Sequence, residues 1–455
     1  MTLPLDVNWL AARIADTSVK GIAAATGVLI REGEIPVGAH LPAVRDLAER
    51  LGVSPATVSA AWGQLKRQKV IAGKGRSGVW VCGDNVTPRP VRFEKIGNYG
   101  SAIRADLAMA SPDPALLPDL REAMLQGVQC AQLNSYQRDA IAPGLLAAIR
   151  PRWPCAAEAW LATDGGFDAM NCIVQTLITP GDRVIIEDPT ATRLLDMLDN
   201  VGAEMMPLAC DEEGPLPGAL AILLKKGATA MIYQPGTHSA TGKTVSKTRS
   251  QQLAEALKES RTLIIEDNGI GDLAAQAIYS LGSYFPDRTL HVHSFSKAYG
   301  PDLRLGVLSG PMALVKRIQS WRNFGASWTS RILQHAVAWM LNDPATQQQI
   351  EHAKAIYATR RKALLTALAQ RGLTLPERDG LSIFIPVESE QFAMITLAAR
   401  GIAVLPGERC RSGGIQFIRV STAMMQPEQI NAIADALVLA SGREINEWTD
   451  HAPGD

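Results

Sequence analysis

From about residue 105 onwards, short apolar runs alternate with segments of helical periodicity, and this alternation limits the possible folds more than any other feature. The apolar runs lie at 160–162, 183–186, 230–233, 263–267 and 289–292. Strands that alternate with helices build a mainly parallel sheet covered by helices on both faces. Two later apolar segments, 401–407 and 415–420, predict a smaller C-terminal α/β lobe. A chain of 455 residues has room for such a domain and a second one.

The first 80 residues show a different pattern, in which two helical stretches are joined by a tight turn. Apolar residues at helical spacing end at Gly52, and glycine favours helix C-termini. Ser54 is a suitable N-cap for the second helix, with Pro55 at its first position. Two apolar runs, 70–71 and 79–81, then flank a basic glycine-rich turn and predict a two-stranded wing. Such a helix pair can place its second helix in a DNA major groove, although it can also be a packing appendage.

The run from Leu41 to Val58, together with the glycine of the wing, makes the DNA-binding interpretation more specific. It resembles the winged helix-turn-helix of GntR-type bacterial repressors over about residues 15–82. The resemblance implies that double-stranded promoter or operator DNA is the partner. With one lysine of the basic turn added, the expected DNA-contacting residues are Arg45, Ser54, Thr57, Ser59, Lys74, Arg76 and Gly78.

A segment with two prolines and no clear period follows the wing. Pro88 and Pro90 interrupt regular structure, and no strong periodicity returns before about residue 104. A structureless stretch of this length is unusual inside one compact domain. We therefore predict a DNA-binding domain at 1–83, a linker at 84–104 and a large domain at 105–455.

A lysine with two serines just before it, and an arginine seven residues after it, follows the strand expected at 289–292. The amine of Lys297 can form a Schiff base with an aldehyde once it is desolvated, and pyridoxal 5'-phosphate is such an aldehyde. The hydroxyls of Ser294 and Ser296 and the guanidinium of Arg304 are suitable ligands for its phosphate. An isolated Ser-x-Ser-Lys is more often a solvated loop, so the interpretation depends on residues elsewhere.

Three further features suit the same cofactor. A glycine turn at 163–166 leads into a helix, and free N–H groups at a helix N-terminus bind phosphate. Asp267 ends an apolar strand, where open α/β sheets bind ligands, and its carboxylate could keep a pyridine nitrogen protonated. Arg419 interrupts another apolar strand and is a candidate for binding a substrate carboxylate.

In this order along the chain, these features resemble the fold-type-I pyridoxal-phosphate enzymes, the aspartate aminotransferase superfamily, over about residues 105–440. With the winged helix in front, the whole chain is similar to MocR/PdxR-type transcriptional regulators, and residues 300–305 are similar to their PtsJ-like branch. The resemblance also implies a head-to-tail homodimer. It assigns the cofactor to Lys297, Asp267, Arg304, Ser294, Ser296, Gly166, Phe167, Ser239 and, from a neighbouring subunit, Tyr136, and it assigns an effector carboxylate to Arg419.

Three positions depart from the pattern of the superfamily. Ala191 stands where the superfamily usually has an aromatic side chain over the cofactor ring, and Gly269 stands where it has a tyrosine. Ser239 replaces the asparagine that bonds the ring oxygen. A serine can still bond that oxygen, but an alanine cannot stack and a glycine has no hydroxyl. We therefore expect weak or absent transamination and a lower cofactor affinity than in a working aminotransferase.

Three functions remain open from the sequence. The first is a DNA-binding regulator that uses pyridoxal phosphate, or a small amine or amino acid that reacts with it, as effector. The second is an active aminotransferase with an accessory DNA-binding domain. The third is a DNA-binding regulator that has lost the cofactor.

Composition and cysteine spacing exclude several other classes of protein. Six scattered cysteines without a C-x-x-C pair argue against a metal site or a disulfide framework. Asp6 and Arg13 interrupt the N-terminus, and no apolar run approaches the length of a membrane span. We therefore expect a cytoplasmic protein without a membrane partner. Because the formal net charge is zero, any nucleic-acid surface must be local.

Overall fold

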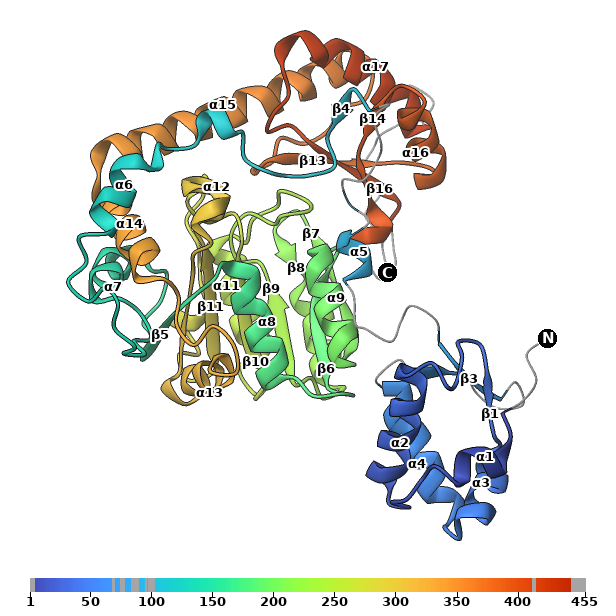
Figure 1. Ribbon diagram of the computed structural model, residues 1–455. Coiled ribbons are helices and arrows are strands. Elements are labelled where there is room, and N and C mark those ends of the chain that lie inside the picture. The colour runs from blue at the N-terminus through green and yellow to red at the C-terminus, as the bar shows by residue number, and fades with distance from the viewer. Residues whose placement is uncertain are drawn as a thin grey trace. The chain divides into compact units, whose positions relative to one another are not determined.

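The computed structural model describes residues 5–67, 70–73, 78–82, 90–94, 96, 103–410 and 415–442. The chain divides into two compact units, one up to Pro90 and one from Val91 onwards (Figure 1). This division falls inside the segment that the sequence predicts as a linker.

The first unit contains four helices and a small antiparallel sheet among its described residues. The helices are α1 (Val7–Ala11), α2 (Val19–Arg31), α3 (Val44–Leu51) and α4 (Pro55–Arg67), and the strands are β1 (His40–Leu41), β2 (Ile71–Ala72) and β3 (Val79–Val81). The strand order is β1-β3-β2. Gly52 ends α3 in the left-handed conformation, with φ of 66°, so the chain can turn directly into α4. Leu47, Val58 and Trp62 from α3 and α4 are buried in one core.

An eight-stranded sheet forms the centre of the large lobe in the described part of the second unit. In sheet order its strands are β5 (Ala159–Thr163), β12 (Gly306–Gly310), β11 (Thr289–Ser294), β10 (Leu263–Asn268), β9 (Ala230–Tyr233), β6 (Arg183–Asp188), β7 (Glu204–Asp211) and β8 (Gly214–Pro215). Pairing is parallel from β11 to β7, whereas β12 is antiparallel to both of its neighbours. The predicted α/β class with a mainly parallel sheet is therefore confirmed.

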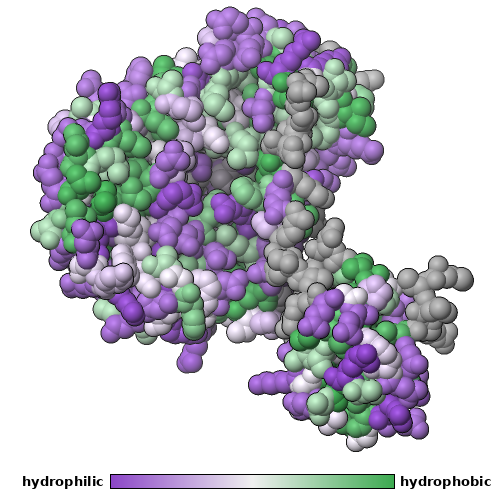
Figure 2. Space-filling model, viewed as in Figure 1, coloured by the Kyte–Doolittle hydropathy of each residue, from purple (hydrophilic) through white to green (hydrophobic). Residues whose placement is uncertain are grey.

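Helices cover both faces of this sheet because successive strand residues point to opposite sides. In β6, Val184 and Ile186 pack on the side of α8 (Gly166–Leu177), α9 (Thr192–Val201) and α13 (Met312–Arg322). Ile185 packs on the other side with α10 (Pro217–Leu224) and α11 (Lys247–Leu257). That side also carries α6 (Leu120–Gly127), α7 (Pro143–Ile149) and α14 (Arg331–Asn342) nearer to β5. Figure 2 shows apolar residues gathered on the surface over α6, α7 and α14.

A smaller lobe closes the second unit. It contains an antiparallel sheet of β13 (Ser382–Pro386), β16 (Phe417–Ser421) and β15 (Leu405–Pro406), and the pair β14 (Ile402–Ala403) and β4 (Ala105–Asp106). Helices α16 (Glu390–Ala398) and α17 (Ile430–Ser441) pack on it. The 26-residue helix α15 (Pro344–Ala369) joins the lobes. Ile350 and Tyr357 of this helix are buried in the core of the large lobe, whereas Leu364 and Leu368 are buried in that of the small lobe.

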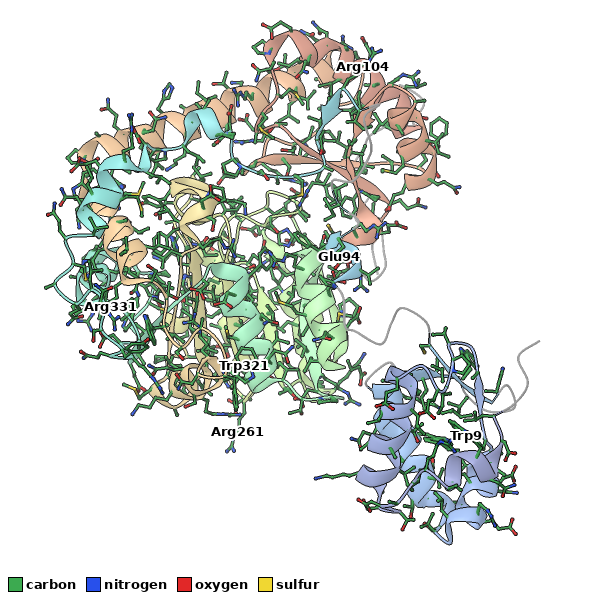
Figure 3. The ribbon with its side chains drawn as sticks, in the orientation of Figure 1. Trp9, Glu94, Arg104, Arg261, Trp321 and Arg331 are labelled. Atoms are coloured by element: carbon green, nitrogen blue, oxygen red, sulfur yellow. The ribbon has the colours of Figure 1, made fainter. Side chains whose placement is uncertain are left out.

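The short helix α5 (Val91–Glu94), which follows the division between the units, lies on α9. Glu94, labelled in Figure 3, marks its position. Nη1 of Arg92 donates to Asp196 and Asp199 at 3.1 and 2.6 Å. The start of the large unit is therefore held by charge-assisted hydrogen bonds.

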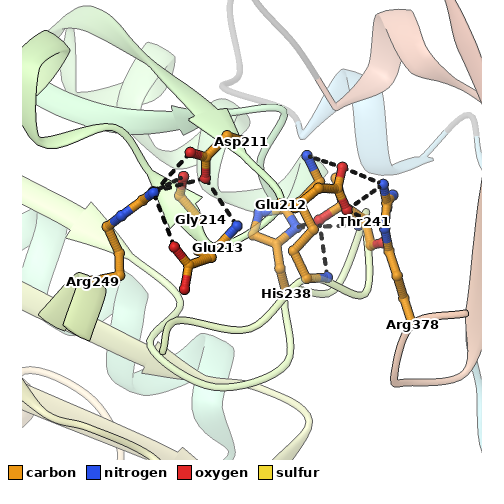
Figure 4. A network of polar contacts seen from close by, with 9 residues as sticks. Asp211, Glu212, Glu213, Gly214, His238, Thr241, Arg249 and Arg378 are labelled. Carbon is orange, nitrogen blue, oxygen red and sulfur yellow. Dashed lines mark hydrogen bonds and ion pairs between the residues drawn. The ribbon is translucent and has the colours of Figure 1, made fainter. Parts of the chain in front are cut away.

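A second set of contacts joins the two lobes beside the loop at 239–242 (Figure 4). Nη2 of Arg378 donates to both carboxylate oxygens of Glu212, at 2.7 and 2.8 Å, and the backbone N–H of Asp379 donates to the carbonyl of Gly242. On the other side of Glu212, Arg249 holds Asp211 through two bonds of 2.7 Å. The small lobe is thus attached to the loop that carries Ser239.

Candidate functional site

Lys297 and Asp267 come from neighbouring parallel strands at the carboxyl edge of the sheet. Asp267 pairs in register with Val292, so β11 ends beside β10 and leads directly into α12 (Ser296–Tyr299), which carries the lysine. Nζ of Lys297 donates to the carbonyl oxygen of Gly269, two residues after Asp267, at 3.2 Å. Because parallel strands end at the same edge, residues 30 positions apart in sequence meet in one crevice.

The environment of Lys297 favours a reactive amine. Burial lowers the pKa of Lys297, the charge of Asp267 opposes this shift, and the charge of Arg419 adds to it. A lowered pKa increases the fraction of neutral amine, which is the form that attacks a carbonyl.

Asp267 is held by Gln234, a residue that sequence reasoning missed. Nε2 of Gln234 donates to Oδ2 of Asp267 at 3.1 Å, and its Oε1 accepts from the backbone N–H of Ser239 at 2.6 Å. Burial raises the pKa of Asp267, whereas the hydrogen bond from Gln234 and the charge of Lys297 oppose the rise. A strand-end position after Tyr233 was the only signal in the sequence for Gln234.

A cradle of backbone groups lies at the start of α8. Gly165 has φ of 107°, and a Cβ on Gly166 would stand 2.9 Å from Cβ of Ser294, so the two segments approach as only glycine permits. Nη2 of Arg304 donates to the carbonyl of Asp164 at 2.9 Å, beside Gly165. The backbone N–H of Ser296 donates to Oγ of Ser294 at 3.4 Å. A helix N-terminus, hydroxyls and a guanidinium together fit a phosphate.

Phe167 is expected to contribute its backbone to the cradle, and its ring also contacts the guanidinium of Arg193. The guanidinium of Arg193 lies between the rings of Phe167 and Phe93, at 4.4 and 4.5 Å from their centroids. Burial and the charge of Arg304 lower the pKa of Arg193. The cradle is therefore connected to α5 through a stacked cation, which no local pattern in the sequence indicated.

Of the three departures from the superfamily pattern, Gly269 and Ser239 contact residues of this site. Ala191 is buried at the N-cap of α9, and Gly269 uses its carbonyl oxygen as the partner of Lys297. Ser239 is fixed by the hydrogen bond from its backbone N–H to Gln234.

Tyr136 and Arg419 differ in their relation to the site within a single chain, because the charge of Arg419 acts on Lys297 whereas Tyr136 is exposed. Tyr136 is 88 % exposed, and its ring meets Trp328 edge-on at 6.1 Å, so it does not reach the cradle of its own chain. Arg419 lies on β16 and its Nη2 donates to the carbonyl oxygen of Ala108 at 2.8 Å.

A buried acid and a buried histidine beneath the loop at 239–242 were also missed. Glu187, at the end of β6, accepts a hydrogen bond from the backbone N–H of Gln234 at 2.7 Å, and its Oε2 lies 3.7 Å from Nε2 of His238. Burial raises the pKa of Glu187 to about 8 and lowers that of His238 to about 3. Both side chains are therefore neutral at pH 7 and form no ion pair.

The expected DNA-contacting residues lie on or beside the two helices of the first unit. Arg45 and Ser59 are exposed on α3 and α4. Oγ of Ser54 caps α4 by accepting from the backbone N–H of Thr57 at 3.2 Å, and the two hydroxyls lie 2.9 Å apart. Gly78, with φ of 71°, directly precedes the second wing strand, β3. Lys74 and Arg76 lie outside the described residues.

The described residues contain no helix that is both long and apolar enough to cross a membrane. Within the same part of the chain, no group of three or more His, Cys, Asp or Glu side chains is arranged to hold a metal ion.

Comparison with known proteins gives two family matches. Residues 106–437 match the aminotransferase class I and II family, and residues 20–81 match the bacterial regulatory proteins of the gntR family. The chain is 30 % identical to the vitamin B6 salvage pathway transcriptional repressor PtsJ of Salmonella typhimurium, over 87 % of this chain and 91 % of that protein. It is 25 % identical to the pyridoxine biosynthesis transcriptional regulator PdxR of Corynebacterium glutamicum, over 83 % and 85 % of the two chains.

A solved structure supports the same fold. The multiple substrate aminotransferase of Thermococcus profundus superposes with a TM-score of 0.68 at 19 % identity, over 77 % of this chain and 94 % of that one. The chain therefore belongs to the MocR/PdxR-type transcriptional regulators, in which a GntR-type DNA-binding domain precedes a class I and II aminotransferase domain.

Proposed function

We propose that this protein is a DNA-binding transcriptional regulator whose large unit binds pyridoxal phosphate at Lys297 and responds to it, or to a small amine or amino acid that reacts with it. The observation that carries the proposal is the buried amine of Lys297 beside Asp267 and the glycine cradle, in a chain that also has a winged helix. Because we propose that the protein acts on DNA, we also expect it in the cytoplasm.

The residues of the site fit this cofactor in two respects. The phosphate would occupy the cradle of Gly166, Ser294 and Arg304, where an added Cβ would intrude. Asp267 would hold a proton on the ring nitrogen, and Gln234 keeps that carboxylate oriented. When bound, the cofactor supplies an electrophilic carbonyl and an electron-withdrawing ring.

Slow turnover is part of the proposal. Without an aromatic ring at Ala191 and a hydroxyl at Gly269, nothing at these two positions holds the cofactor ring flat or tunes its oxygen. Attachment then depends mainly on Lys297, Asp267 and the cradle. This combination suits a sensor, which must bind its ligand but does not need rapid catalysis.

A ligand changes DNA affinity only if it binds two states of the protein unequally. Arg419 is our candidate for binding the carboxylate of an amino-acid effector, which requires its guanidinium to exchange the carbonyl of Ala108 for the ligand. The lobe contacts of Arg378 and Glu212 lie beside the same site, so opening and closing of the small lobe is the change we expect to differ between states.

We also propose a head-to-tail homodimer. Leu125 of α6 and Val128, directly after this helix, are 58 % and 49 % exposed. Figure 2 shows apolar residues gathered on the surface over α6, α7 and α14. Tyr136 is nearby in sequence and almost fully exposed, while Arg331 of α14 donates to the carbonyl of Ser135 and fixes the loop (Figure 3). A second copy that covers this surface would bring Tyr136 towards the partner's phosphate, and two reader helices would contact paired half-sites.

The test of cofactor binding is a titration with pyridoxal phosphate that follows the imine absorbance and binding to upstream DNA together. Borohydride trapping with peptide mapping should place a pyridoxyl adduct on Lys297, and Lys297→Ala should remove it. Lys258→Ala, at an exposed lysine, is the matched control. Protein that remains colourless would support a regulator that has lost its cofactor, and multiple turnover that depends on Lys297 would support an active aminotransferase.

The DNA-binding surface has its own test. Arg45→Ala combined with Thr57→Ala should weaken binding to the upstream DNA, because both residues lie at the expected reading surface. Lys20→Ala, at an exposed position on α2, serves as the control. Equal affinity of the double variant and the control would place the reading surface elsewhere.

A further inference from the structure

A cavity lies on the opposite side of the strand ends that carry the Lys297 site. Successive residues of a strand point to opposite faces, so Asn268 is turned away from Asp267 and His293 is turned away from Ser294. Asn268 and His293 are partners in the register of β10 and β11, and both line a cavity of about 430 Å³. None of the residues assigned above to the cofactor lines this cavity.

The cavity combines an apolar wall with polar groups. Trp153, Phe295 and Ile350 are among its apolar lining residues. The indole of Trp153 packs against the imidazole of His293, with ring centroids 5.8 Å apart, and this contact helps to hold the Trp153 ring in place. A volume of this size lies within the range of pockets that bind small organic ligands.

An acceptor in the wall is available to a ligand. Oδ1 of Asn268 accepts from the backbone N–H of Gly271, so its Nδ2 donates to Nδ1 of His293 at 2.9 Å. The ring proton of His293 is then on Nε2, which lies 3.6 Å from Oδ1 of Asp272, too far for a good hydrogen bond. Oδ2 of Asp272 is buried, whereas the Asp272 side chain as a whole is 30 % exposed, so Oδ1 is the carboxylate oxygen that a ligand can reach.

The charge of Asp272 is retained at neutral pH. Burial alone would raise the pKa of Asp272, but His293, Tyr299 and Arg152 outweigh it and lower the pKa to about 2. A donor on a ligand would therefore meet a charged acceptor, which forms a stronger hydrogen bond than a neutral one.

The basic residues of the cavity already have partners, which disfavours a phosphate. Arg152 donates to the carbonyl of Leu341 at 2.6 Å and to the side-chain oxygen of Gln347 at 3.1 Å. Lys354 is bonded to Glu351 at 2.8 Å. Glu351 balances the charge of Lys354, and the charge of Arg152 acts on Asp272, so an anion would meet the Asp272 carboxylate without a further cation to balance it.

We propose that this cavity is a second small-molecule site, for an aromatic or heteroaromatic compound that carries a hydroxyl or other donor and no phosphate. The donor binds Asp272 and the ring packs against Trp153 and Phe295. Occupancy acts on Asn268 and His293, which directly adjoin Asp267 and Ser294 in the chain. Binding at the cavity does not depend on the function proposed above, whereas its effect on the cofactor site does.

Two probes of similar ring size test the site by calorimetry on the full chain. Pyridoxine carries hydroxyl donors and no phosphate, and it should bind. Benzoate carries a carboxylate and should not bind. Asp272→Asn should weaken pyridoxine binding about 10-fold or more, because a hydrogen bond to a charged acceptor is lost. Ala277→Trp, at an exposed residue that lines the cavity, should abolish it by filling the entrance.

The variants also separate this proposal from cofactor binding. In Ala277→Trp the imine absorbance with pyridoxal phosphate should remain, which shows that the protein is folded and that the Lys297 site is intact. Pyridoxine that binds both cavity variants as tightly as the original chain, but is displaced by pyridoxal phosphate, would overturn the second site. Absence of pyridoxine binding in a chain that still forms the imine would overturn it as well.

Discussion

The neutral, buried Glu187 gives a prediction about the pH dependence of stability. Its ordinary pKa is 4.5, and burial raises the pKa to about 8 in the folded chain. The folded state therefore binds the proton more tightly than the unfolded state does. For this sign of shift, the contribution of Glu187 to stability is complete below about pH 4.5 and is lost as the pH rises towards 8.

The size of the effect follows from the two pKa values. Between about pH 5.5 and about pH 7.5, linkage predicts that Glu187 costs the folded state about 2.5 kcal/mol of stability. Glu187→Gln keeps the size of the side chain and an acceptor for the backbone N–H of Gln234, but it cannot ionise. We therefore expect the free energy of unfolding of the variant to rise by about this amount relative to the original chain over the same interval.

The assay should report on the large unit alone, because a chain of two units does not unfold in a single step. Cys172 is buried in α8, in the same core as β6, so its pulsed thiol labelling along a urea series measures unfolding of this unit. The fall in the pKa of His238 to about 3 affects both chains equally and cancels in the comparison.

Glu255→Gln, at an exposed acid on α11, is the control and should leave the pH dependence unchanged. Parallel stability curves for the Glu187→Gln variant and the original chain would show that Glu187 is ionised in the folded protein. The neutral pairing of Glu187 with His238 would then be wrong.

Three further substitutions test other parts of the structure. Gly166→Ala places a Cβ against β11, and this overpacking costs about 1–3 kcal/mol. The affinity for pyridoxal phosphate, measured by absorbance titration, should therefore fall about 10-fold or more. Gly218→Ala, at a glycine with open space around it, should leave the affinity unchanged. Gln234→Leu removes the hydrogen bond that Gln234 donates to Asp267, and it should lower the affinity for the cofactor in the same titration. An unchanged affinity would show that Gln234 does not position Asp267. Ser54→Ala removes the cap of α4 and should destabilise the first unit by about 1 kcal/mol in thermal unfolding, while Ser59→Ala should leave stability unchanged.

The order of the main strands could be predicted in part, because their apolar runs are long and end in polar residues. Asp267 and Lys297 were found for this reason, since Asp267 ends such a run and Lys297 follows shortly after another. The antiparallel strand β12 and the short strand β1 were not anticipated. Their pairing depends on partners far along the chain, which no local pattern shows.

The residues that support the site could not be found from local patterns. Gln234 and Asp267 are 33 positions apart, and the stack of Phe93 on Arg193 joins residues separated by 100 positions. A glutamine after a strand and a phenylalanine near a linker do not indicate a role in the site by themselves, because their partners are close only in the folded chain. Tyr136 presents the opposite case, because the role implied by resemblance needs a second chain.

The long helix α15 and the contacts of Arg378 have a joint mechanical consequence. The helix is about 39 Å long at 1.5 Å per residue and is embedded in the large lobe at one end and in the small lobe at the other. The hydrogen bonds of Arg378 and Asp379 connect the two lobes at a second, separate position. Two lobes that are connected at two separated points cannot rotate freely about either connection. The small lobe can therefore rotate away from the large lobe only when the hydrogen bonds of Arg378 and Asp379 are broken.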